Sequence, residues 1–295
     1  MKTKGIILAG GRGSRLYPLT VTASKQLQAV YDKPMIYYPL TTLMLAGVRD
    51  ILIITMPQDL PAFRRLLKDG SQWGVRISFA EQVEPRGIAE SLIIGKEYCR
   101  DADKVCLILG DNLFYGKLDF LRKAIADTRA GLEVFAYQMQ NPQAYGVIEF
   151  APNGEVVGIE EKPAEPKSSY ALSGLYVFDR ECFKYVEKIT PSARGELEIT
   201  DIQKEYLQRG TLRATLMGRG IVWFDTGTVD DLTEASTFIA AIEKRQGRKI
   251  ACPEEISLFA NFVSAEEYVE NLRSMPNSPY KNYCQQILER YENNK

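Results

Sequence analysis

The stretch IILAGGRGSRL, residues 6–16, carries an apolar run into a loop that has three glycines in four positions. An apolar run that ends in this way predicts a buried strand. Glycine leaves backbone N–H groups uncovered, so the loop can face an anion such as a phosphate. Basic residues that can neutralise a polyphosphate follow closely, namely Arg12, Arg15 and Lys25. The stretch therefore predicts a strand that leads into an anion-binding loop.

Two well-known phosphate-binding patterns do not fit this loop. The dinucleotide fingerprint G-x-G-x-x-G can begin at Gly11 and continue at Gly13, but Leu16 occupies its last position. The P-loop pattern G-x-x-x-x-G-K-[ST] begins neither at Gly5 nor at any later glycine of the stretch. From these residues alone, a phosphate loop of another kind and an ordinary strand-to-helix turn both remain open.

Strand-like and helix-like segments alternate from this loop to about residue 130. Strands are expected at 50–55, 76–80 and 104–109, and helices at 40–46, 60–67 and 87–98. Such alternation predicts an α/β fold with a Rossmann-like, mostly parallel mixed sheet flanked by helices. Ligands of these sheets bind beyond the carboxyl ends of the strands, where both the glycine loop and Asp111 lie. We therefore expect a single site at that edge.

The pattern becomes β-rich after residue 131. Short strands are expected at 134–137, 146–150, 156–160, 170–178, 212–217 and 221–224. Helices are expected at 181–188, 197–208 and 230–245, with further helical segments near 265–273 and 280–292. We interpret residues 1–245 as one domain with halves at 1–130 and 131–245. Residues 246–295 form a helical C-terminal appendage in this interpretation.

The composition excludes several classes of protein. The 295 residues include 37 basic and 38 acidic side chains, so the net charge of −1 gives no support to bulk binding of nucleic acid or an anionic membrane. No stretch approaches the roughly 20 apolar residues of a membrane span. The five cysteines are scattered, odd in number and without CxxC spacing, which favours reduced thiols in a cytoplasmic protein.

The chain contains no histidine. This excludes Ser-His and Cys-His nucleophile pairs and any imidazole zinc site. Nucleotidyl transfer fits the restriction, because a phosphate oxygen is already an anionic nucleophile. The protein then has to align the reactants and neutralise charge.

Three motifs carry a resemblance to a known family. Residues 8–20 read L-A-G-G-x-G-[ST]-R-L-x-P-x-T, residues 24–26 read S-K-Q, and residues 32–40 read D-K-P-M-I-Y-Y-P-L. The chain resembles the sugar nucleotidyltransferases (sugar-nucleotide pyrophosphorylases), and among them the glucose-1-phosphate thymidylyltransferases. The resemblance implies Mg²⁺-dependent transfer from dTTP to glucose 1-phosphate for deoxysugar (rhamnose-type) polysaccharide synthesis. It also implies that residues 1–130 bind nucleotide, that 131–245 bind sugar, and that a homotetramer carries a feedback site near Tyr115, Gly116 and Arg219.

The resemblance also assigns roles to residues. Magnesium would be held by Asp111 and Asp225, and the catalytic residues would be Arg15, Lys25, Asp111, Lys162 and Asp225. The nucleotide would contact Leu8, Gly10, Gly11, Gly13, Ser14, Arg15, Lys25, Gln26, Gln82 and Gly87. The sugar would contact Asn112, Tyr145, Gly146, Glu161, Lys162, Leu172 and Tyr176. Residues 195–201 (GELEITD) also match the family, and we interpret them as a helix start that covers the sheet.

The chain departs from the family pattern at four places. Gln28-Ala29 stands where Leu-Pro is usual, and Ser14 often appears as Thr. Arg86 replaces an Asp and Glu90 replaces a Gln beside the expected base pocket. The choice between dTTP and UTP, and the identity of the sugar, therefore remain open.

Two other functions fit the sequence less well than nucleotidyl transfer. An NAD-type oxidoreductase lacks both the third glycine and an acidic residue at the end of a second strand. A non-catalytic nucleotide-sugar sensor would have lost basic or metal-binding residues that this chain retains.

Overall fold

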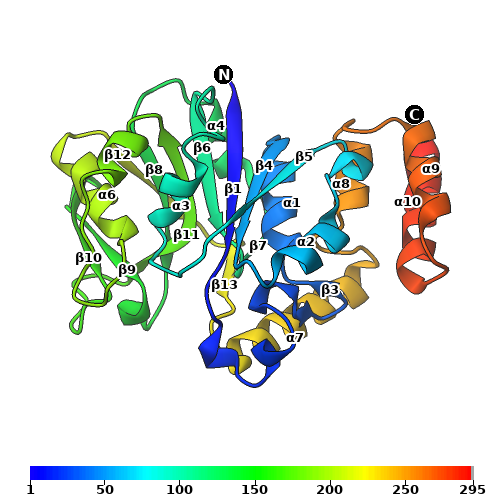
Figure 1. Cartoon of the computed structure of the whole chain (residues 1–295), viewed down its shortest axis with the longest axis horizontal. Helices are drawn as coiled ribbons and strands as arrows, with labels where there is room; N and C mark the ends of the chain where they lie inside the picture. Colours follow the sequence, from blue (N-terminus) through cyan, green and yellow to red (C-terminus); the bar gives the residue numbers. More distant parts are fainter. Residues whose placement is uncertain (294–295) are drawn as a thin grey trace.

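The computed structural model describes residues 1–293, and a nine-stranded mixed sheet forms its centre (Figure 1). Neighbouring strands follow the order β10-β9-β11-β6-β1-β4-β5, while β8 pairs with β11 and β12. Four strands of the first half pair in parallel: β6 (Lys104–Leu109), β1 (Thr3–Ala9), β4 (Asp50–Thr55) and β5 (Arg76–Glu81). Their apolar sequences suit strands that are covered on both faces.

The strands of the second half extend the same sheet. β11 (Tyr170–Asp179) lies antiparallel to β6 and joins the two halves. The remaining strands are β8 (Leu132–Gln138), β9 (Gly146–Phe150), β10 (Val156–Glu161) and β12 (Leu212–Met217). The expected α/β class with a mixed sheet is confirmed. The division of the domain at residue 130 stays a prediction, since one sheet runs through both halves.

Helices cover both faces of the sheet because side chains alternate along the buried strands. Ile7 of β1 points into one apolar core and Ile6 into the other. The first core is closed by α1 (Tyr37–Leu45), α2 (Leu60–Leu67) and α4 (Asp119–Ala126). The second is closed by α3 (Glu90–Gly95), α5 (Cys182–Val186) and α6 (Ile199–Gln208).

Short elements connect these layers at the carboxyl edge of the parallel strands. One antiparallel ribbon pairs β7 (Asn112–Tyr115) with β13 (Val222–Asp225), and a smaller ribbon pairs β2 (Ala29–Val30) with β3 (Lys33–Pro34). Single 3₁₀ turns at this edge are η1 (Ser14–Leu16), η2 (Leu19–Val21), η3 (Lys25–Leu27) and η5 (Pro142–Ala144), while η4 (Ser71–Trp73) precedes β5 at the opposite edge. The β7–β13 ribbon brings residues from both halves of the domain to one edge of the sheet.

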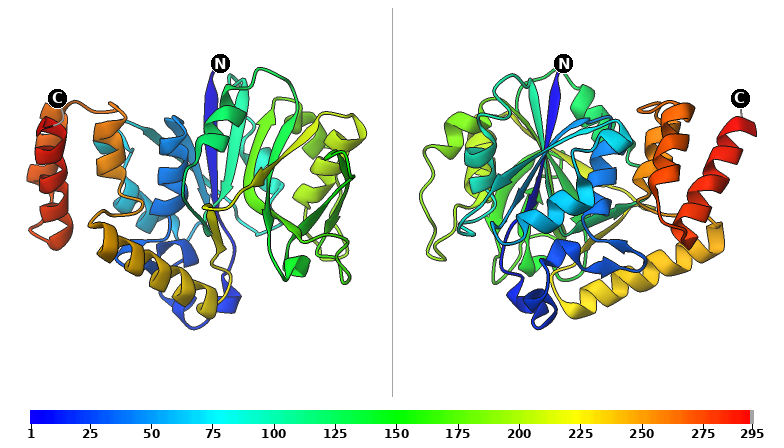
Figure 2. Two further views of the ribbon diagram at one scale, coloured as in Figure 1. Left: turned by 180° about the vertical axis from the view of Figure 1, so that it is seen from behind. Right: turned by 45° about the vertical axis from the view of Figure 1, so that its right-hand side comes forward.

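Four helices end the described chain: α7 (Val229–Gln246), α8 (Pro253–Phe259), α9 (Ala265–Ser274) and α10 (Pro279–Asn293). The last three stand beside the sheet as a group with a small apolar core of their own (Figure 2). The Trp73 indole nitrogen donates to Glu254 Oε1 at 3.0 Å and ties this group to the main domain. The start of the appendage at residue 246 falls at the end of α7, and this boundary stays a prediction.

Most expected elements agree with the structure within a few residues, and the exceptions have simple causes. The helix expected at 87–98 is shorter, because turns occupy residues 87–89 and 96–98 around α3. The sequence patterns predict none of the elements β2, β3, β7, α4 and α8. β7 has only four residues and its partner lies more than a hundred positions away, so no local pattern reports it. Among residues 1–293, no helix has the length and apolar character needed to cross a membrane.

Candidate active site

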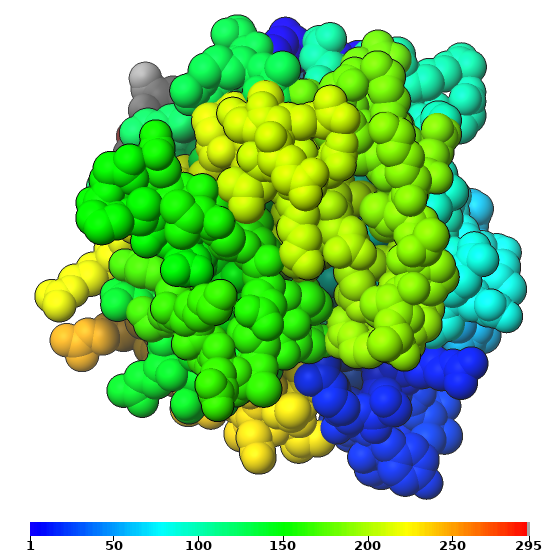
Figure 3. All heavy atoms as spheres, turned by 90° about the vertical axis from the view of Figure 1, so that its left-hand side faces the viewer, coloured from blue at the N-terminus to red at the C-terminus, as the bar shows by residue number. Residues whose placement is uncertain are grey.

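A cavity of about 860 Å³ opens at the carboxyl ends of β1 and β6, between the two halves of the domain. In a space-filling view the surface is hollowed between green and yellow-green segments, close to the blue N-terminal segment (Figure 3). Every site residue expected from the sequence lines this cavity, except Gln82 and Gly87. The glycine loop and Asp111 therefore share one cavity, as the strand pattern predicted, and Asp225 lines the same cavity.

The glycine loop has a backbone that side chains would obstruct. Gly11 and Gly13 adopt φ angles of 93° and 57°, in the left-handed region that favours glycine. A Cβ atom at Gly13 would lie 2.7 Å from Thr20 Cγ2, and one at Gly10 would lie 2.0 Å from Gln82 Oε1. Leu16, which breaks the dinucleotide fingerprint, is fully buried in an apolar cluster and anchors the end of the loop.

Arg15 extends from this loop to the far side of the cavity. A Cβ atom at Gly227 would lie 3.1 Å from one guanidinium nitrogen of Arg15, so the guanidinium lies across the backbone that follows Asp225. Arg15 itself is exposed, whereas Lys25 is buried and forms an ion pair with Asp111. Lys25 thus pairs with Asp111, while Arg15 lies beside the backbone that follows Asp225.

Gln26 supports the loop from below. Its amide nitrogen donates to the Gly10 carbonyl at 3.4 Å, and its amide oxygen accepts from the Ser24 hydroxyl at 2.8 Å. Only 4% of Gln26 is exposed, so these bonds form inside the protein. The S-K-Q motif therefore places the Lys25 ammonium in the cavity and stabilises the glycine loop through the hydrogen bond of Gln26.

Asp111 and Asp225 converge because the β7–β13 ribbon aligns them. Asp225 is paired with Asn112, the residue after Asp111, and the Thr226 amide donates to the Asp111 carbonyl at 3.1 Å. Burial and the neighbouring Asp111 charge raise the pKa of Asp225 to about 7. Burial alone would also raise the pKa of Asp111, but the Lys25 ammonium outweighs it and lowers that pKa below its ordinary value. The nearby cations therefore stabilise the charged form of Asp111 more than that of Asp225.

Asn112 holds Asp111 in place. Its buried amide oxygen accepts from the Trp223 indole nitrogen at 2.7 Å and from the Gly174 amide at 2.9 Å. These bonds turn the amide nitrogen toward Asp111 Oδ1, to which it donates at 3.0 Å. Trp223 thereby acts on the acid through Asn112, a link that no sequence motif reports.

The wall of the second half carries the expected sugar-side residues. Lys162 adopts a φ of 44°, which is rare for a residue other than glycine, and its amide donates to the Tyr145 carbonyl at 3.0 Å. Glu161 accepts a hydrogen bond from the Thr200 hydroxyl. Gly146, Leu172 and Tyr176 complete this wall. An acid and a cation thus stand side by side on the wall that faces the glycine loop.

Gln82 and Gly87 lie behind the cavity on the expected base side. Gln82 is 2% exposed, and its amide oxygen lies where a side chain at Gly10 would be. Gly87 has a φ of 106° and packs so closely on the Leu197 backbone that a Cβ atom would lie 2.5 Å from that carbonyl. Leu8 lines the cavity on the same side.

Part of the cavity wall that carries Glu161 and Lys162 was not predicted from the sequence. Residues 195–201 were expected only to cover the sheet, but Glu196, Ile199 and Thr200 line the cavity, and so does Gln203 in the next turn. The Gln203 amide oxygen is buried and has no hydrogen-bond partner within residues 1–293. The match of this stretch to the family was the signal that could have identified it.

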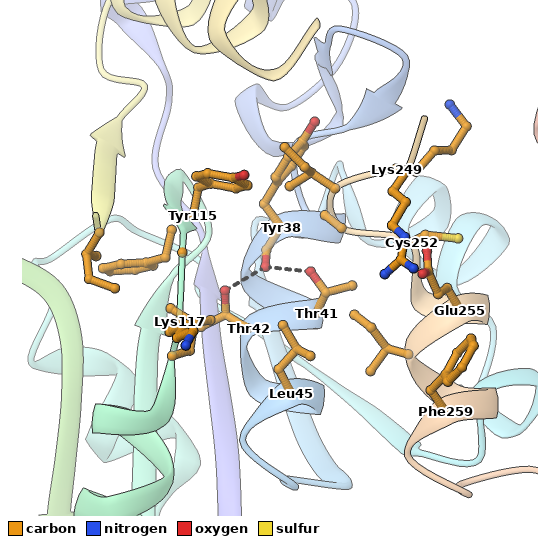
Figure 4. Close-up of a pocket in the computed structure, with 18 of the residues that line it drawn as sticks. Tyr38, Thr41, Thr42, Leu45, Tyr115, Lys117, Lys249, Cys252, Glu255 and Phe259 are labelled. Carbon is orange, nitrogen blue, oxygen red and sulfur yellow. Dashed lines mark hydrogen bonds between the residues drawn. The ribbon is translucent and has the colours of Figure 1, made fainter. Parts of the chain in front are cut away.

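A second cavity, of about 820 Å³, lies at the other end of the β7–β13 ribbon (Figure 4). It is bordered by α1, by the chain from β7 to α4, by the β12–β13 turn and by the segment from α7 to α8. The lining combines aromatic side chains with basic ones, the latter being Lys117, Arg122, Arg219, Arg248 and Lys249. The Thr41 and Thr42 hydroxyls both donate to the Tyr38 carbonyl, at 3.0 and 2.9 Å. All three residues expected near a feedback site, Tyr115, Gly116 and Arg219, line this second cavity.

Comparisons with known proteins agree with this geometry. The family described as "Nucleotidyl transferase" matches residues 4–242. A glucose-1-phosphate thymidylyltransferase of Neisseria meningitidis is 50% identical over 97% of this chain and 100% of its own length. One from Mycobacterium tuberculosis is 48% identical over 97% of this chain and 99% of its own length.

Solved structures show the same fold. A Bacillus anthracis protein assigned as a glucose-1-phosphate thymidylyltransferase, crystallised with sucrose, is 38% identical and has a TM-score of 0.75, covering 80% of this chain and 94% of its own. A UDP-glucose pyrophosphorylase in complex with UDP-glucose shares the fold at a TM-score of 0.72 and 24% identity, covering 83% of this chain and 100% of its own. The chain therefore belongs to the nucleotidyl transferase family, as an enzyme related over nearly its whole length to the glucose-1-phosphate thymidylyltransferases.

Proposed function

We propose that this enzyme transfers a thymidylyl group from dTTP to glucose 1-phosphate and releases pyrophosphate. The observation that carries the proposal is the single cavity in which the glycine loop and Arg15 face a wall that holds Glu161 and Lys162. The names of the relatives indicate the two substrates. The same chemistry with UTP or with another sugar 1-phosphate is the alternative that the assay below distinguishes.

The glycine loop binds the triphosphate in this proposal. Its backbone N–H groups face the phosphates, while Arg15 and Lys25 neutralise the charge that develops on the pyrophosphate leaving group. Leu8, Gln82 and Gly87 contact the base. Gln82 suits a pyrimidine imide, because its amide oxygen can accept a hydrogen bond from the imide N–H.

Asp111 and Asp225 fit a magnesium ion. The ion prefers a few carboxylate oxygens together with substrate phosphates, which is the donor set that this edge of the sheet offers. Burial and Asp111 hold the pKa of Asp225 at about 7 even though Lys25 and Arg15 lower it, so a divalent ion would stabilise the charged form of this acid. When bound, Mg²⁺ would neutralise charge at the α-phosphate.

The opposite wall positions the acceptor. Lys162 holds the sugar phosphate and Glu161 accepts hydrogen bonds from sugar hydroxyls, with Asn112 and Tyr145 alongside. A phosphate oxygen of the sugar 1-phosphate then attacks the α-phosphorus in line, a new P–O bond forms, and the bond to the β-phosphate breaks. The C–O bond at the anomeric carbon stays intact, so the sugar keeps its configuration.

A pyrophosphate-release assay tests the proposal. Purified enzyme is offered dTTP, UTP, dCTP, ATP and GTP in turn, with several sugar 1-phosphates, in Mg²⁺ or in EDTA. We expect turnover that needs Mg²⁺ and is fastest with dTTP and glucose 1-phosphate. Turnover that is unaffected by EDTA would contradict the magnesium site, and faster turnover with UTP would favour the alternative.

We also propose that the second cavity binds a nucleotide sugar and regulates the enzyme. Its basic and aromatic lining suits a diphosphate and a base. Arg219→Ala, remote from the first cavity, should leave basal turnover unchanged and weaken inhibition by dTDP-sugars. Inhibition of equal strength in the variant would place the regulatory site elsewhere.

The remaining expectations concern the cell and the assembly. The five cysteines are all unpaired and buried, which supports a reducing, cytoplasmic location. The relationship to the thymidylyltransferases supports a homotetramer and a supply of dTDP-glucose for rhamnose-type polysaccharides. Light scattering at several protein concentrations tests the tetramer, and a monomer at all of them would refute it.

A further inference from the structure

Glu90 is a buried carboxylate that the proposed mechanism does not use. It lies at the start of α3 with 4% of its surface exposed. Its oxygens accept from Gln82 Nε2 at 2.8 Å, from Arg86 Nε at 2.8 Å and from the Arg86 amide at 3.2 Å. A buried carboxylate needs such hydrogen-bond partners to offset its lost hydration. These partners do not by themselves account for the position of a carboxylate beside Gln82.

The contacts of Glu90 fix which way the Gln82 amide points. A carboxylate in an ion pair only accepts hydrogen bonds, so it must face the nitrogen end of the amide. The second acceptor near that nitrogen is the Gly87 carbonyl, at 3.5 Å. The oxygen end is therefore turned the other way, against Gly10, and Gly10 lines the active-site cavity.

We propose that Glu90 is a positioning residue which holds the Gln82 amide with its oxygen toward the base, so that the enzyme accepts imide-bearing pyrimidines and rejects cytosine. The proposal rests on the function proposed above and adds the means of base selection. Thymine and uracil carry an N3–H donor on the edge where cytosine carries a bare N3 acceptor. A fixed carbonyl oxygen binds the donor and opposes the acceptor.

Arg86 completes the arrangement from the surface. Its guanidinium pairs with Glu90 Oε1 at 2.7 Å and remains 61% exposed, so it neutralises the carboxylate without entering the base side. A glutamine at position 90 would offer one oxygen to three donors, and its own nitrogen could donate to the Gln82 oxygen. Both amide orientations of Gln82 would then be accessible.

Base discrimination in Glu90→Gln tests the proposal. We compare kcat/KM for dTTP, UTP and dCTP in the wild type, in Glu90→Gln and in Glu84→Gln, a matched control at an exposed residue of the same loop. In Glu90→Gln the preference for dTTP over dCTP should fall about tenfold, while the preference for dTTP over UTP stays unchanged, because both bases carry the imide. The control should keep both ratios.

A double-mutant cycle separates positioning from a general loss of structure. Glu90→Gln should have no further effect on discrimination once Gln82→Leu has removed the amide. An additive loss, or an unchanged dTTP to dCTP ratio in Glu90→Gln, would overturn the proposal. Dissociation constants of dTTP and dCTP, measured by titration calorimetry, supply the same ratio without turnover. Failure of the transferase assay therefore stays distinguishable from failure of this inference.

Discussion

At the scale of single residues, the buried carboxylate of Asp225 lowers the stability of the folded protein when it is charged. Its pKa is raised to about 7 because it is buried beside Asp111, so the folded protein holds its proton more tightly than the unfolded chain does. The charged form therefore costs stability, and the cost grows as the pH rises from about 4 to 7 and persists above that range. A ligand cation removes this cost.

We therefore predict that Asp225→Asn stabilises the metal-free protein at pH 8. The gain should be at least about 1 kcal/mol, or roughly 2–4 °C in Tm, and it should vanish near pH 4, where the wild-type acid is protonated. Thermal unfolding in EDTA at both pH values measures it. Added Mg²⁺ should raise the Tm of the wild type more than that of the variant. A variant less stable than the wild type at pH 8 would contradict the assignment.

Lys162 gives a second prediction for a single residue. It is exposed at the cavity wall and held by an unusual backbone angle, so its loss should leave the fold intact. Lys162→Ala should raise KM for glucose 1-phosphate by about tenfold or more, since one charge-assisted hydrogen bond is lost, and should change KM for dTTP little. Steady-state kinetics with each substrate varied in turn measures the split. An equal rise in both KM values would speak against a sugar-side role.

At the scale of elements, a capping box at the start of α7 stabilises the loop that carries Asp225. The Thr228 hydroxyl accepts from the Asp231 amide at 3.2 Å, and the Asp231 carboxylate accepts from the Thr228 amide at 2.9 Å. Because only three residues separate the end of β13 from the start of α7, the cap fixes the direction of the chain beside Asp225.

Thr228→Ala should accordingly lower stability by about 1 kcal/mol. Thr237→Ala, in the exposed middle of the same helix, is the matched control and should cost much less, since its hydroxyl only bonds back to the Thr233 carbonyl. Urea unfolding of both variants decides the matter. An equal loss of unfolding free energy in the two variants would show that the capping box does not stabilise the protein.

The same scale shows where prediction from sequence succeeds and fails. The apolar runs of β1, β4 and β6 and the glycines that follow β1 were sufficient to predict strands, their order of appearance and one shared edge. The family motifs supplied 17 of the 32 residues that line the cavity. The ribbon of β7 and β13 and the Trp223–Asn112–Asp111 chain of hydrogen bonds depend on contacts across more than a hundred residues, which no local pattern records. Glu196 and Thr200 were missed because a helix start was a sufficient explanation of their motif.

At the scale of the whole molecule, a buried ion pair joins distant segments. Lys33 of β3, 2% exposed, donates to Glu243 Oε1 of α7 at 2.8 Å, and Glu243 also lies 3.4 Å from the Lys249 ammonium at the second cavity. Lys33 and Lys249 also pair with Asp32, so the two lysines balance the two acids, and removal of Lys33 leaves one buried negative charge uncompensated.

Lys33→Met should therefore destabilise the protein by about 3 kcal/mol. The double variant Lys33→Met with Glu243→Leu should recover much of that loss, since no isolated charge remains. Chemical denaturation of the two variants measures the difference. A double variant that is less stable than Lys33→Met alone would show that Glu243 matters chiefly to Lys249 and the Ile250 amide, which donates to it at 2.7 Å.

The β7–β13 ribbon touches both cavities, with Asn112 and Asp225 at one end and Tyr115 paired to Val222 at the other. A ligand that displaces the ribbon at one cavity also displaces residues at the other cavity. Thermodynamic linkage then requires that each ligand change the affinity of the other by the same factor. If a dTDP-sugar at the far end weakens dTTP binding by some factor, dTTP must weaken the dTDP-sugar by the same factor. The concentration of dTTP would then determine the concentration of dTDP-sugar that is needed to inhibit the enzyme.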